Sequence, residues 1–207
     1  MKKIIAGMLF LVLMSCSSTR LVDSWKNSEV KDFTPQKMMV LGITQNLTAR
    51  RIFEQDLKDE LLKRNIDAVE SSRVLGDSFT QSMKSEEEIN SLNDELLSKG
   101  FDALIITAVK GADEVQTFRP ENHWPRFGRY YYRFQDIYYN PGYYQNYKVY
   151  RVETSIYNLK EKEGKSLVWV GDFDIVDPQK ISSSVNDYVK AITAKLEKDK
   201  IIKTINN

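Results

Sequence analysis

The sequence predicts an α/β (α+β) fold in which a single mixed β-sheet carries about three packed helices, in the order β-α-β-α-β-β-β-α. Two patterns support this prediction. Short apolar runs that suit buried strands alternate with segments of helical periodicity, and a hairpin pattern follows them in the C-terminal third. With 207 residues, 42% of them hydrophobic and 29% charged, the chain has the composition of a globular protein.

The charge balance and the cysteine content narrow the possible partners and stabilising bonds. The chain has 30 basic and 29 acidic residues, for a formal net charge of +1. Domains that bind nucleic acid carry a clustered excess of positive charge, so we do not expect nucleic acid as the main partner. Because Cys16 is the only cysteine, no disulfide can form within one chain, and the core itself must stabilise the fold.

The first fifteen residues have the pattern of an export signal. A basic start, Met1-Lys2-Lys3, precedes an uncharged, mostly apolar stretch at 4–14. As a helix this stretch would reach about 16 Å at 1.5 Å per residue, against about 30 Å for the hydrocarbon core of a bilayer. Residues 1–15 are therefore predicted to be a signal peptide rather than a membrane-spanning anchor.

The residues that follow resemble the lipobox of bacterial lipoprotein precursors. Leu13-Met14-Ser15-Cys16 has leucine three positions before the cysteine and a small residue directly before it. The resemblance implies cleavage before Cys16, a thioether-linked diacylglycerol and fatty acylation, such as palmitate, of the new amino group. Two or more acyl chains would hold the protein stably on a membrane. The alternative is a buried core residue, the usual role of a lone cysteine.

The predicted location is the bacterial cell envelope. Residues 16–20 would form a short lipidated tether, and residues 21–207 a single α/β domain. Ser17 is not acidic, which in the enterobacterial pattern favours the outer membrane, with the domain facing the periplasm.

The strands and helices of the first half follow from local patterns. The segment 21–25 alternates as a short edge strand with Trp25 pointing inward, and the apolar run 38–43 suits a strand covered on both faces. A helix over 48–64, with Asn46 or Thr48 as N-cap, leads to a strand at 66–69. This helix would bury the apolar residues at helical spacing, which are Ile52, Phe53, Leu57, Leu61 and Leu62.

The second half begins with a capping box formed by Ser85 and Glu88, and Gly100 is a suitable end for the helix. A second central strand is expected at 103–109, and a helix capped by Ser182–Ser184 would end near Asp199. The expected inner residues of these two helices are Ile89, Leu92, Leu96 and Leu97, then Val185, Val189, Ile192 and Leu196.

Residues 148–176 have the alternating pattern of a β-hairpin, and this alternation also limits its register. The inner residues have even numbers on the first strand of the hairpin and odd numbers on the second. The numbers of two inner residues that lie directly opposite each other therefore add up to an odd number, as for Ile156 and Trp169. A shift of one residue would turn the apolar set of one arm toward solvent.

The order of elements resembles the small α/β domain at the start of the periplasmic protein TolB and in the curli-secretion lipoprotein. The likeness rests on the apolar first strand, the amphipathic helix, the run Lys99–Ile106 and Val168-Trp169 at the end of the hairpin. The chain also resembles a set of uncharacterised bacterial lipoproteins at Ser24-Trp25, Val40–Ile43 and Arg50–Glu54. These resemblances imply an architecture and a location, and they bring no catalytic residues.

The composition changes sharply at residues 118–147, which hold eight of the chain's 11 tyrosines together with four arginines. Three interpretations stay open: an insertion that folds back over the sheet, a recognition surface for an envelope protein, glycan or lipid headgroup, and a disordered loop. For the second, the hypothesised partner-binding residues are Trp124, Arg126, Arg129, Tyr130, Tyr132, Arg133, Tyr139 and Tyr143.

Few residues suggest metal binding or catalysis. The only histidine, His123, lacks the partners that a metal site needs. Asp172, Asp174 and Asp177 form a carboxylate cluster that suits a hard cation, or a solvated face that pairs with a base such as Arg151. We predict no metal and no cofactor.

A possible anion site follows the first central strand. Thr44-Gln45-Asn46, with Arg50-Arg51 after them, would lie at a helix N-terminus beside the carboxyl end of that strand, where α/β proteins bind anions. The alternative is an N-cap followed by solvated arginines. The sequence has no glycine-rich nucleotide motif.

The predicted function is a membrane-anchored, non-catalytic binding or accessory module that contacts an envelope partner through residues 118–147. The alternative is a hydrolase that acts on an envelope glycan or lipid, with Asp172 and Asp174 as acid and base. That alternative requires the two carboxyl groups to border a cleft.

Overall fold

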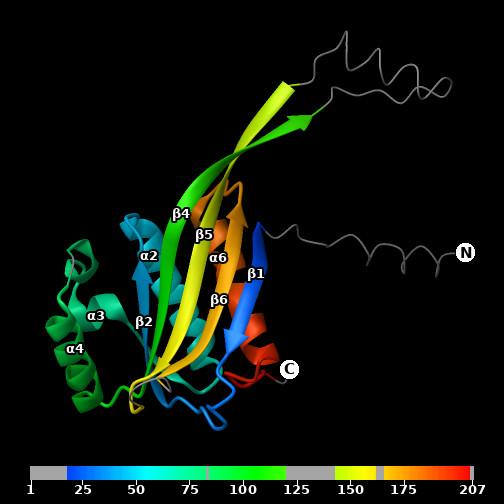
Figure 1. The fold of residues 1–207 in the computed structure, drawn as a ribbon. Helices are drawn as coiled ribbons and strands as arrows, with labels where there is room; N and C mark the ends of the chain where they lie inside the picture. Colours follow the sequence, from blue (N-terminus) through cyan, green and yellow to red (C-terminus); the bar gives the residue numbers. More distant parts are fainter. Residues whose placement is uncertain (1–17, 83, 120–142, 162–165, 206–207) are drawn as a thin grey trace, which may run out of the picture.

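Six strands form one mixed sheet in the computed structural model, which describes residues 18–82, 84–119, 143–161 and 166–205. The strand order is β1-β6-β5-β4-β2-β3, and Figure 1 shows the strands side by side. Strands β2, β3 and β4 run parallel, and β4, β5, β6 and β1 alternate in direction. This arrangement confirms the predicted fold class. The strands are β1 (Thr19–Lys26), β2 (Lys37–Ile43), β3 (Asp67–Glu70), β4 (Ala103–Arg119), β5 (Tyr143–Asn158) and β6 (Leu167–Val176).

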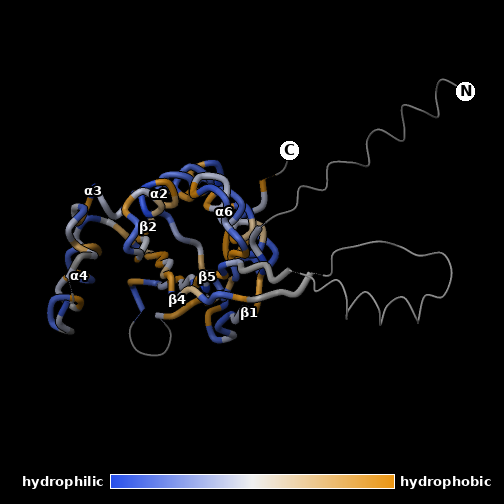
Figure 2. Tube along the Cα trace, turned by 90° about the horizontal axis from the view of Figure 1, so that it is seen from above, coloured by the Kyte–Doolittle hydropathy of each residue, from blue (hydrophilic) through white to orange (hydrophobic). Residues whose placement is uncertain are grey.

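Two long helices cover one face of the sheet. Helices α2 (Leu47–Leu62) and α6 (Ile181–Lys198) lie side by side on that face, as Figure 2 shows from above. The shorter α3 (Ser71–Leu75) and α4 (Glu86–Ser98) lie at the β2–β3 end, with a 3-10 turn at Phe79–Gln81 between them. The short α3 is the helix that the sequence did not predict.

The main core lies between the sheet and the α2–α6 layer. Alternate residues of the central strands point into it, so that each strand contributes every second side chain. A smaller cluster on the opposite face joins β2 to α4 through Met39, Leu96 and Phe101, with Leu159 beside them. The largest fully buried side chains of the main core are Trp169, Phe173, Met38, Leu57, Leu61, Ile105, Ile156, Ile192 and Leu196.

The hairpin has the predicted register. Ile156 lies opposite Trp169 and Val152 opposite Phe173, and all four side chains are buried in the main core. Their burial on one face fixes the register, because a slip of one residue would expose the whole set.

Trp25 points outward, with 51% of its surface exposed, so the prediction that it points inward is wrong. A β-bulge at Val22 is the reason: Leu21 pairs with Phe173, and Asp23 then pairs with Asp172. The extra residue reverses the side-chain alternation for the rest of the strand. Trp25 therefore lies opposite Val170 on the outer face of the sheet.

The predicted helix ends are mostly confirmed. Asn46 caps α2 by accepting a hydrogen bond from the Ala49 N–H (3.0 Å). Ser85 and Glu88 form the capping box of α4. Gly100 follows α4 with a φ of 81°, a conformation that glycine adopts without strain.

Three expectations about the helices are corrected. The N-cap of α6 is Lys180, so Ser182–Ser184 lie inside the helix. Leu62 is exposed beside the buried Leu61, because neighbouring residues on a helix point about 100° apart. Ile89 is 47% exposed, since the cluster beneath α4 is formed by residues nearer the end of that helix.

Asp199, at the end of α6, connects this helix to the sheet. Its carboxylate accepts hydrogen bonds from the Trp169 indole N–H (2.8 Å) and from Lys195 (2.8 Å). Burial opposes ionisation of Asp199, but the hydrogen bonds from Lys195 and Trp169 outweigh it and lower the pKa of this carboxyl. A lowered pKa in the folded state means that the ionised carboxylate stabilises the fold above its unfolded pKa.

We expect Asp199→Asn to destabilise the protein at pH 7 by about 1 kcal/mol, because asparagine loses the charge that Lys195 contacts. The difference from the wild type should shrink as the pH falls through the lowered pKa of Asp199, where the wild type also loses the charge. Urea unfolding of both proteins between pH 7 and pH 3 tests this. A difference that stays constant over the range would contradict the assignment.

Candidate functional site

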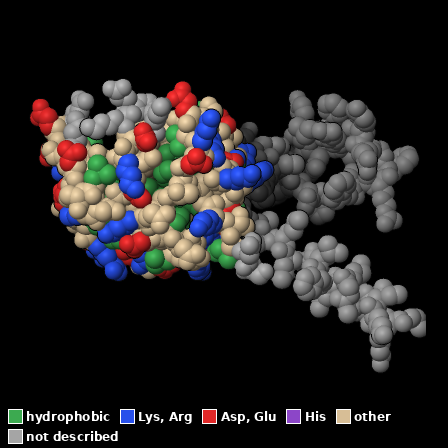
Figure 3. Space-filling model, turned by 90° about the horizontal axis from the view of Figure 1, so that it is seen from below, with side chains coloured by type: hydrophobic (Ala, Val, Ile, Leu, Met, Phe, Trp, Pro, Cys, Tyr) green, Lys and Arg blue, Asp and Glu red, His purple; other side chains and the backbone are tan. Residues whose placement is uncertain are grey.

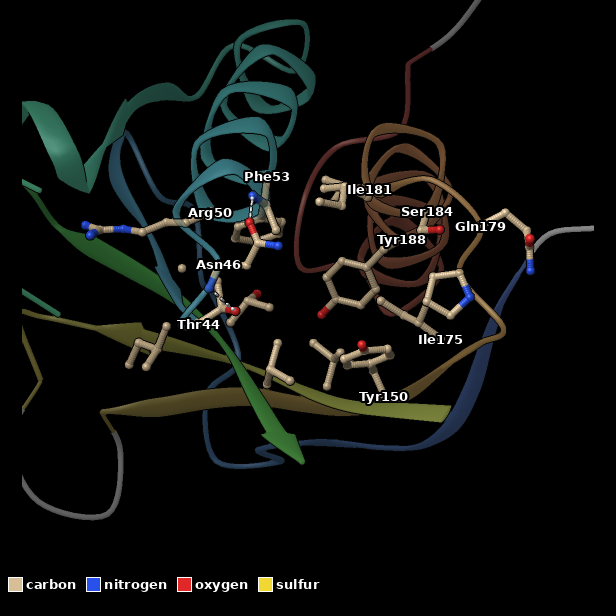
Figure 4. Close-up of a pocket in the computed structure, with 18 residues that line it drawn as sticks. Thr44, Asn46, Arg50, Phe53, Tyr150, Ile175, Gln179, Ile181, Ser184 and Tyr188 are labelled. Atoms are coloured by element: carbon tan, nitrogen blue, oxygen red, sulfur yellow. Dashed lines mark hydrogen bonds between the residues drawn. The ribbon is translucent and has the colours of Figure 1, made fainter. Parts of the chain in front are cut away.

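The structure contains a pocket of about 370 Å³ where β2 ends and the N-termini of α2 and α6 meet the sheet (Figure 4). It lies on the face covered by these two helices, at the carboxyl ends of the parallel strands, where open α/β sheets commonly bind ligands. Its volume is within the range of small-molecule sites. The residues that line it come from β2, α2, β4, β5, β6, α6 and the loops beside them.

The walls of the pocket are mainly apolar. Three large apolar residues that remain exposed to solvent, Ile43, Val109 and Ile181, line it. Each comes from a different element, namely β2, β4 and α6. Further apolar lining comes from Phe53, Tyr150, Val152, Ile175, Pro178 and Val185.

A chain of three hydroxyl groups lies among these apolar walls. The Thr107 and Thr154 hydroxyl oxygens are 2.5 Å apart, and the Thr154 hydroxyl is also hydrogen-bonded to the Tyr188 phenol. Thr107 and Tyr188 both line the pocket, and Figure 4 shows the phenol oxygen of Tyr188 directed into it. Burial raises the pKa of the Tyr188 phenol well above its ordinary value, although its hydrogen bonds to the two threonines oppose this shift. Tyr188 is therefore a neutral hydroxyl donor at physiological pH.

Two aromatic rings fix the position of Tyr188. Phe173 meets it edge to face with ring centroids 5.3 Å apart, and Phe53 lies at 5.9 Å in a tilted arrangement. Such pairs favour one ring orientation, so the phenol is preorganised.

The sequence contained one signal for this site: Thr107 and Thr154 are polar residues at inward positions of otherwise apolar strands.

Both long helices direct their N-termini toward the pocket. The α2 N-terminus is capped by Asn46, whereas Lys180 gives α6 no side-chain cap. Neither helix has an acidic residue in its first turn, and no Asp or Glu lines the pocket. The free N–H groups and the helix dipoles therefore create a positive potential without a compensating carboxylate.

Arg50 does not carry a free charge into this pocket. It is 1% exposed, and its guanidinium turns away from the pocket in Figure 4. There it contacts Glu54 (2.9 Å), Ser71 (2.9 Å) and Thr80 (2.8 Å). The expectation of a solvated Arg50 is wrong, because the segment around α3 folds over this side chain.

The predicted anion site is thus formed in part. Thr44 and Asn46 line the pocket at the N-terminus of α2, as expected. Gln45 is not among the lining residues. Arg51 is exposed and forms an ion pair with Asp77 instead.

The acidic cluster of the hairpin lies away from the pocket. Asp174 pairs with Arg20 (2.7 Å) and Asp172 with Lys110 (3.5 Å) on the outer face. Arg151 pairs with Asp113. Neither Asp172 nor Asp174 lines the pocket, and no group of three or more metal-ligating side chains occurs within the described residues.

Strands β4 and β5 continue beyond the sheet as a two-stranded arm (Figure 1). The last pair that β6 makes with β5 is Val176 with Val149, and β2 ends at the pair Ile43–Ala108. Six further β4–β5 pairs follow, from Glu114–Lys148 to Arg119–Tyr143, so the arm extends about 20 Å at 3.4 Å per residue.

Most of the aromatic segment lies outside the described residues. This applies to Trp124, Arg126, Arg129, Tyr130, Tyr132, Arg133 and Tyr139, and also to His123, Cys16 and the predicted signal peptide. Tyr143 is the first residue of β5, at the far end of the arm.

The face of the molecule seen from below has no dominant charge (Figure 3). Figure 3, seen from below, shows basic and acidic side chains interspersed, with small apolar patches between them. Within the described ranges, no helix is both long enough and apolar enough to cross a bilayer.

Comparison with known proteins gives structural likenesses only. No family model matches the sequence, and no curated protein matches it either. Lipoprotein GNA1162 from Neisseria meningitidis is 10% identical, with a TM-score of 0.42 over 79% of this chain and 99% of that chain. A PelC dodecamer subunit from Paraburkholderia phytofirmans is also 10% identical, with a TM-score of 0.41 over 85% and 94%.

A third similar structure is a PDZ domain protein from Parabacteroides distasonis. It is 10% identical, with a TM-score of 0.41 over 99% of this chain and 41% of that chain. At these values the likenesses assign the chain neither a family nor an activity.

Proposed function

We propose that this protein is a lipid-anchored lipoprotein of the bacterial envelope that serves as a non-catalytic binding or accessory module. In this proposal Cys16 carries the acyl chains, and residues 118–147 contact a partner in the envelope. The observation that carries the proposal is the position of the arm: it extends from the same end of the sheet at which the chain enters the domain.

In the sheet register, the base of the arm and the start of β1 lie at the same end of the sheet. Thr19 in β1, Ile175 in β6 and Tyr150 in β5 are paired across the sheet and so lie at one level. The arm begins just beyond this level. Ser18 contacts Asp187 of α6 through its backbone N–H (3.4 Å). Two residues span at most about 7 Å, so a lipidated Cys16 would hold this end of the domain close to the membrane.

The form and composition of the arm suit recognition. Beyond Val149, no third strand of the described part of the chain pairs with the arm. A two-stranded ribbon is only marginally stable by itself, so the length of the arm favours a role that depends on a contact. The segment it carries is rich in tyrosine and arginine, the residue types that most often dominate binding energy at interfaces.

A photo-crosslinking residue in place of Phe118, within the arm, tests the proposal in native membranes. Joining Arg119 to Tyr143 through Asn-Gly removes 120–142 and closes the paired ends with a two-residue turn. We expect a discrete adduct with the full segment and at least about a tenfold loss with the short turn, which removes the residues that would dominate the contact.

Two controls make the result decisive. A crosslinking residue in place of the exposed Glu87 of α4 should give no such adduct. Cys16→Ser should move the protein from the membrane fraction to the soluble fraction. Equal adduct yields from the short-turn and full-length chains would contradict the role of the segment, and membrane retention of Cys16→Ser would contradict the anchor.

A further inference from the structure

We propose that the pocket between α2 and α6 is a binding site for a medium-chain fatty acid. The aliphatic chain would lie against the apolar walls, and the carboxylate would lie near the hydroxyl chain and the N-terminus of α6. This inference concerns a different part of the molecule from the arm and does not depend on lipidation of Cys16.

The hydroxyl chain presents polar groups to an otherwise apolar pocket. The Thr107 and Thr154 hydroxyls are hydrogen-bonded to each other, and the Thr154 hydroxyl is also bonded to the Tyr188 phenol. Thr107 and Tyr188 line the pocket. A hydroxyl group can donate one hydrogen bond and accept two, so a ligand oxygen beside either residue could accept a hydrogen bond from it.

Ser184 supplies a further hydroxyl group to the pocket. It lines the pocket and is only 6% exposed, and its hydroxyl has no hydrogen-bond partner within the described part of the chain. It lies in the first turn of α6, whose N-terminal N–H groups lack a side-chain cap. Hydroxyl and N–H donors therefore gather at one side of the pocket.

The electrostatics favour an anionic head group. The lining contains no carboxylate, and Arg50, its one charged residue, is neutralised by Glu54 outside the pocket. The two helix N-termini beside the pocket attract negative charge, while Asp172, whose carboxylate acts on Tyr188, pairs with Lys110 on the outer face. A cationic head group would find no opposite charge in this lining.

The apolar walls favour an aliphatic chain over a polar ligand. Ile43, Val109 and Ile181 are exposed where they line the pocket, and covering them removes apolar surface from water. The volume of about 370 Å³ is near the lower end for ligand sites, which favours a medium-chain acid over a bulky lipid.

Calorimetric titration of the full chain carrying Cys16→Ser tests the inference, because this form has no acyl chain of its own to occupy the pocket. We expect decanoate to bind and decylamine, which has the opposite charge, to bind at least about tenfold more weakly. Tyr188→Phe keeps the ring but removes its hydroxyl, and should weaken decanoate binding about fivefold to tenfold.

A pair of matched valine variants locates the binding site. Val109→Phe fills the pocket from an exposed strand position, whereas Val22→Phe adds the same ring at an exposed position of β1 outside the pocket. We expect at least about a tenfold loss of decanoate affinity for the first and no change for the second. Equal affinity in the two variants, equal binding of decylamine, or no decanoate binding would overturn the inference.

Discussion

Glu54→Gln is expected to lower the free energy of unfolding by about 3–5 kcal/mol, the usual cost of removing one member of a buried ion pair. The Glu54 side chain is fully buried and accepts hydrogen bonds from Arg50 (2.9 Å), Ser71 (2.6 Å) and the Gly42 N–H (3.0 Å). Glutamine has nearly the same shape, but it leaves the buried guanidinium of Arg50 without an opposite charge. The NH₂ group of the glutamine would also face a hydrogen-bond donor. That donor is either one of the three groups named above or the Ser72 N–H, which donates to the second carboxylate oxygen of Glu54.

The exposed neighbour of this pair provides the control. Asp77 pairs with Arg51, and both side chains are well exposed, so Asp77→Asn should change stability by less than about 1 kcal/mol. Urea unfolding followed by circular dichroism measures both variants under the same conditions. If Glu54→Gln were as mild as Asp77→Asn, the network around Arg50 would not stabilise the fold as described.

Gly171→Ala is expected to destabilise the protein by about 3 kcal/mol, at the upper end of the cost of overpacking a core. The indole of Trp169 lies directly over Gly171: a β-carbon added there would come within 2.8 and 2.9 Å of two ring atoms, and closer still to a third. Trp169 is completely buried and its indole N–H is bonded to Asp199, so the ring cannot move aside.

Gly111→Ala is the matched control, because a β-carbon at that position of β4 has no neighbour within 4 Å. We expect its stability to lie within about 0.5 kcal/mol of the wild type. In the Gly171→Ala background, Trp169→Phe should cost less than it does alone, since the smaller ring relieves the clash; thermal unfolding of the four proteins measures this coupling. Additive effects would show that the ring does not constrain position 171.

Local patterns were sufficient for much of the fold. The capping box at Ser85 and Glu88 depends on residues three apart, and the hairpin register depends on alternation along two neighbouring strands. Both are determined within short stretches of chain, where side-chain periodicity decides which residues share a face.

The errors occur where a distant contact overrides the local pattern. One extra residue at Val22 reversed the side of the sheet on which Trp25 lies, and alternation in the sequence contains no sign of that bulge. Arg50 has the sequence context of a solvated arginine, yet the segment from Ser71 to Thr80 supplies it with buried partners. A polar residue at an inner strand position, such as Thr154, was the one available sign of an internal polar group.

The sequence by itself determined the α/β class and the hairpin register, because each follows from contiguous or regularly spaced residues. Lipid attachment at Cys16 stays a prediction from the same kind of local pattern. Only the tertiary structure decided that Thr107, Thr154 and Tyr188 share one hydroxyl chain and that the arm and the start of β1 lie at the same end of the sheet. These features join residues that are far apart along the chain. The hydroxyl chain depends on the pairing of β4 with β5 and on the packing of α6 against them, and the position of the arm depends on strand order and register. No local pattern contains these long-range contacts.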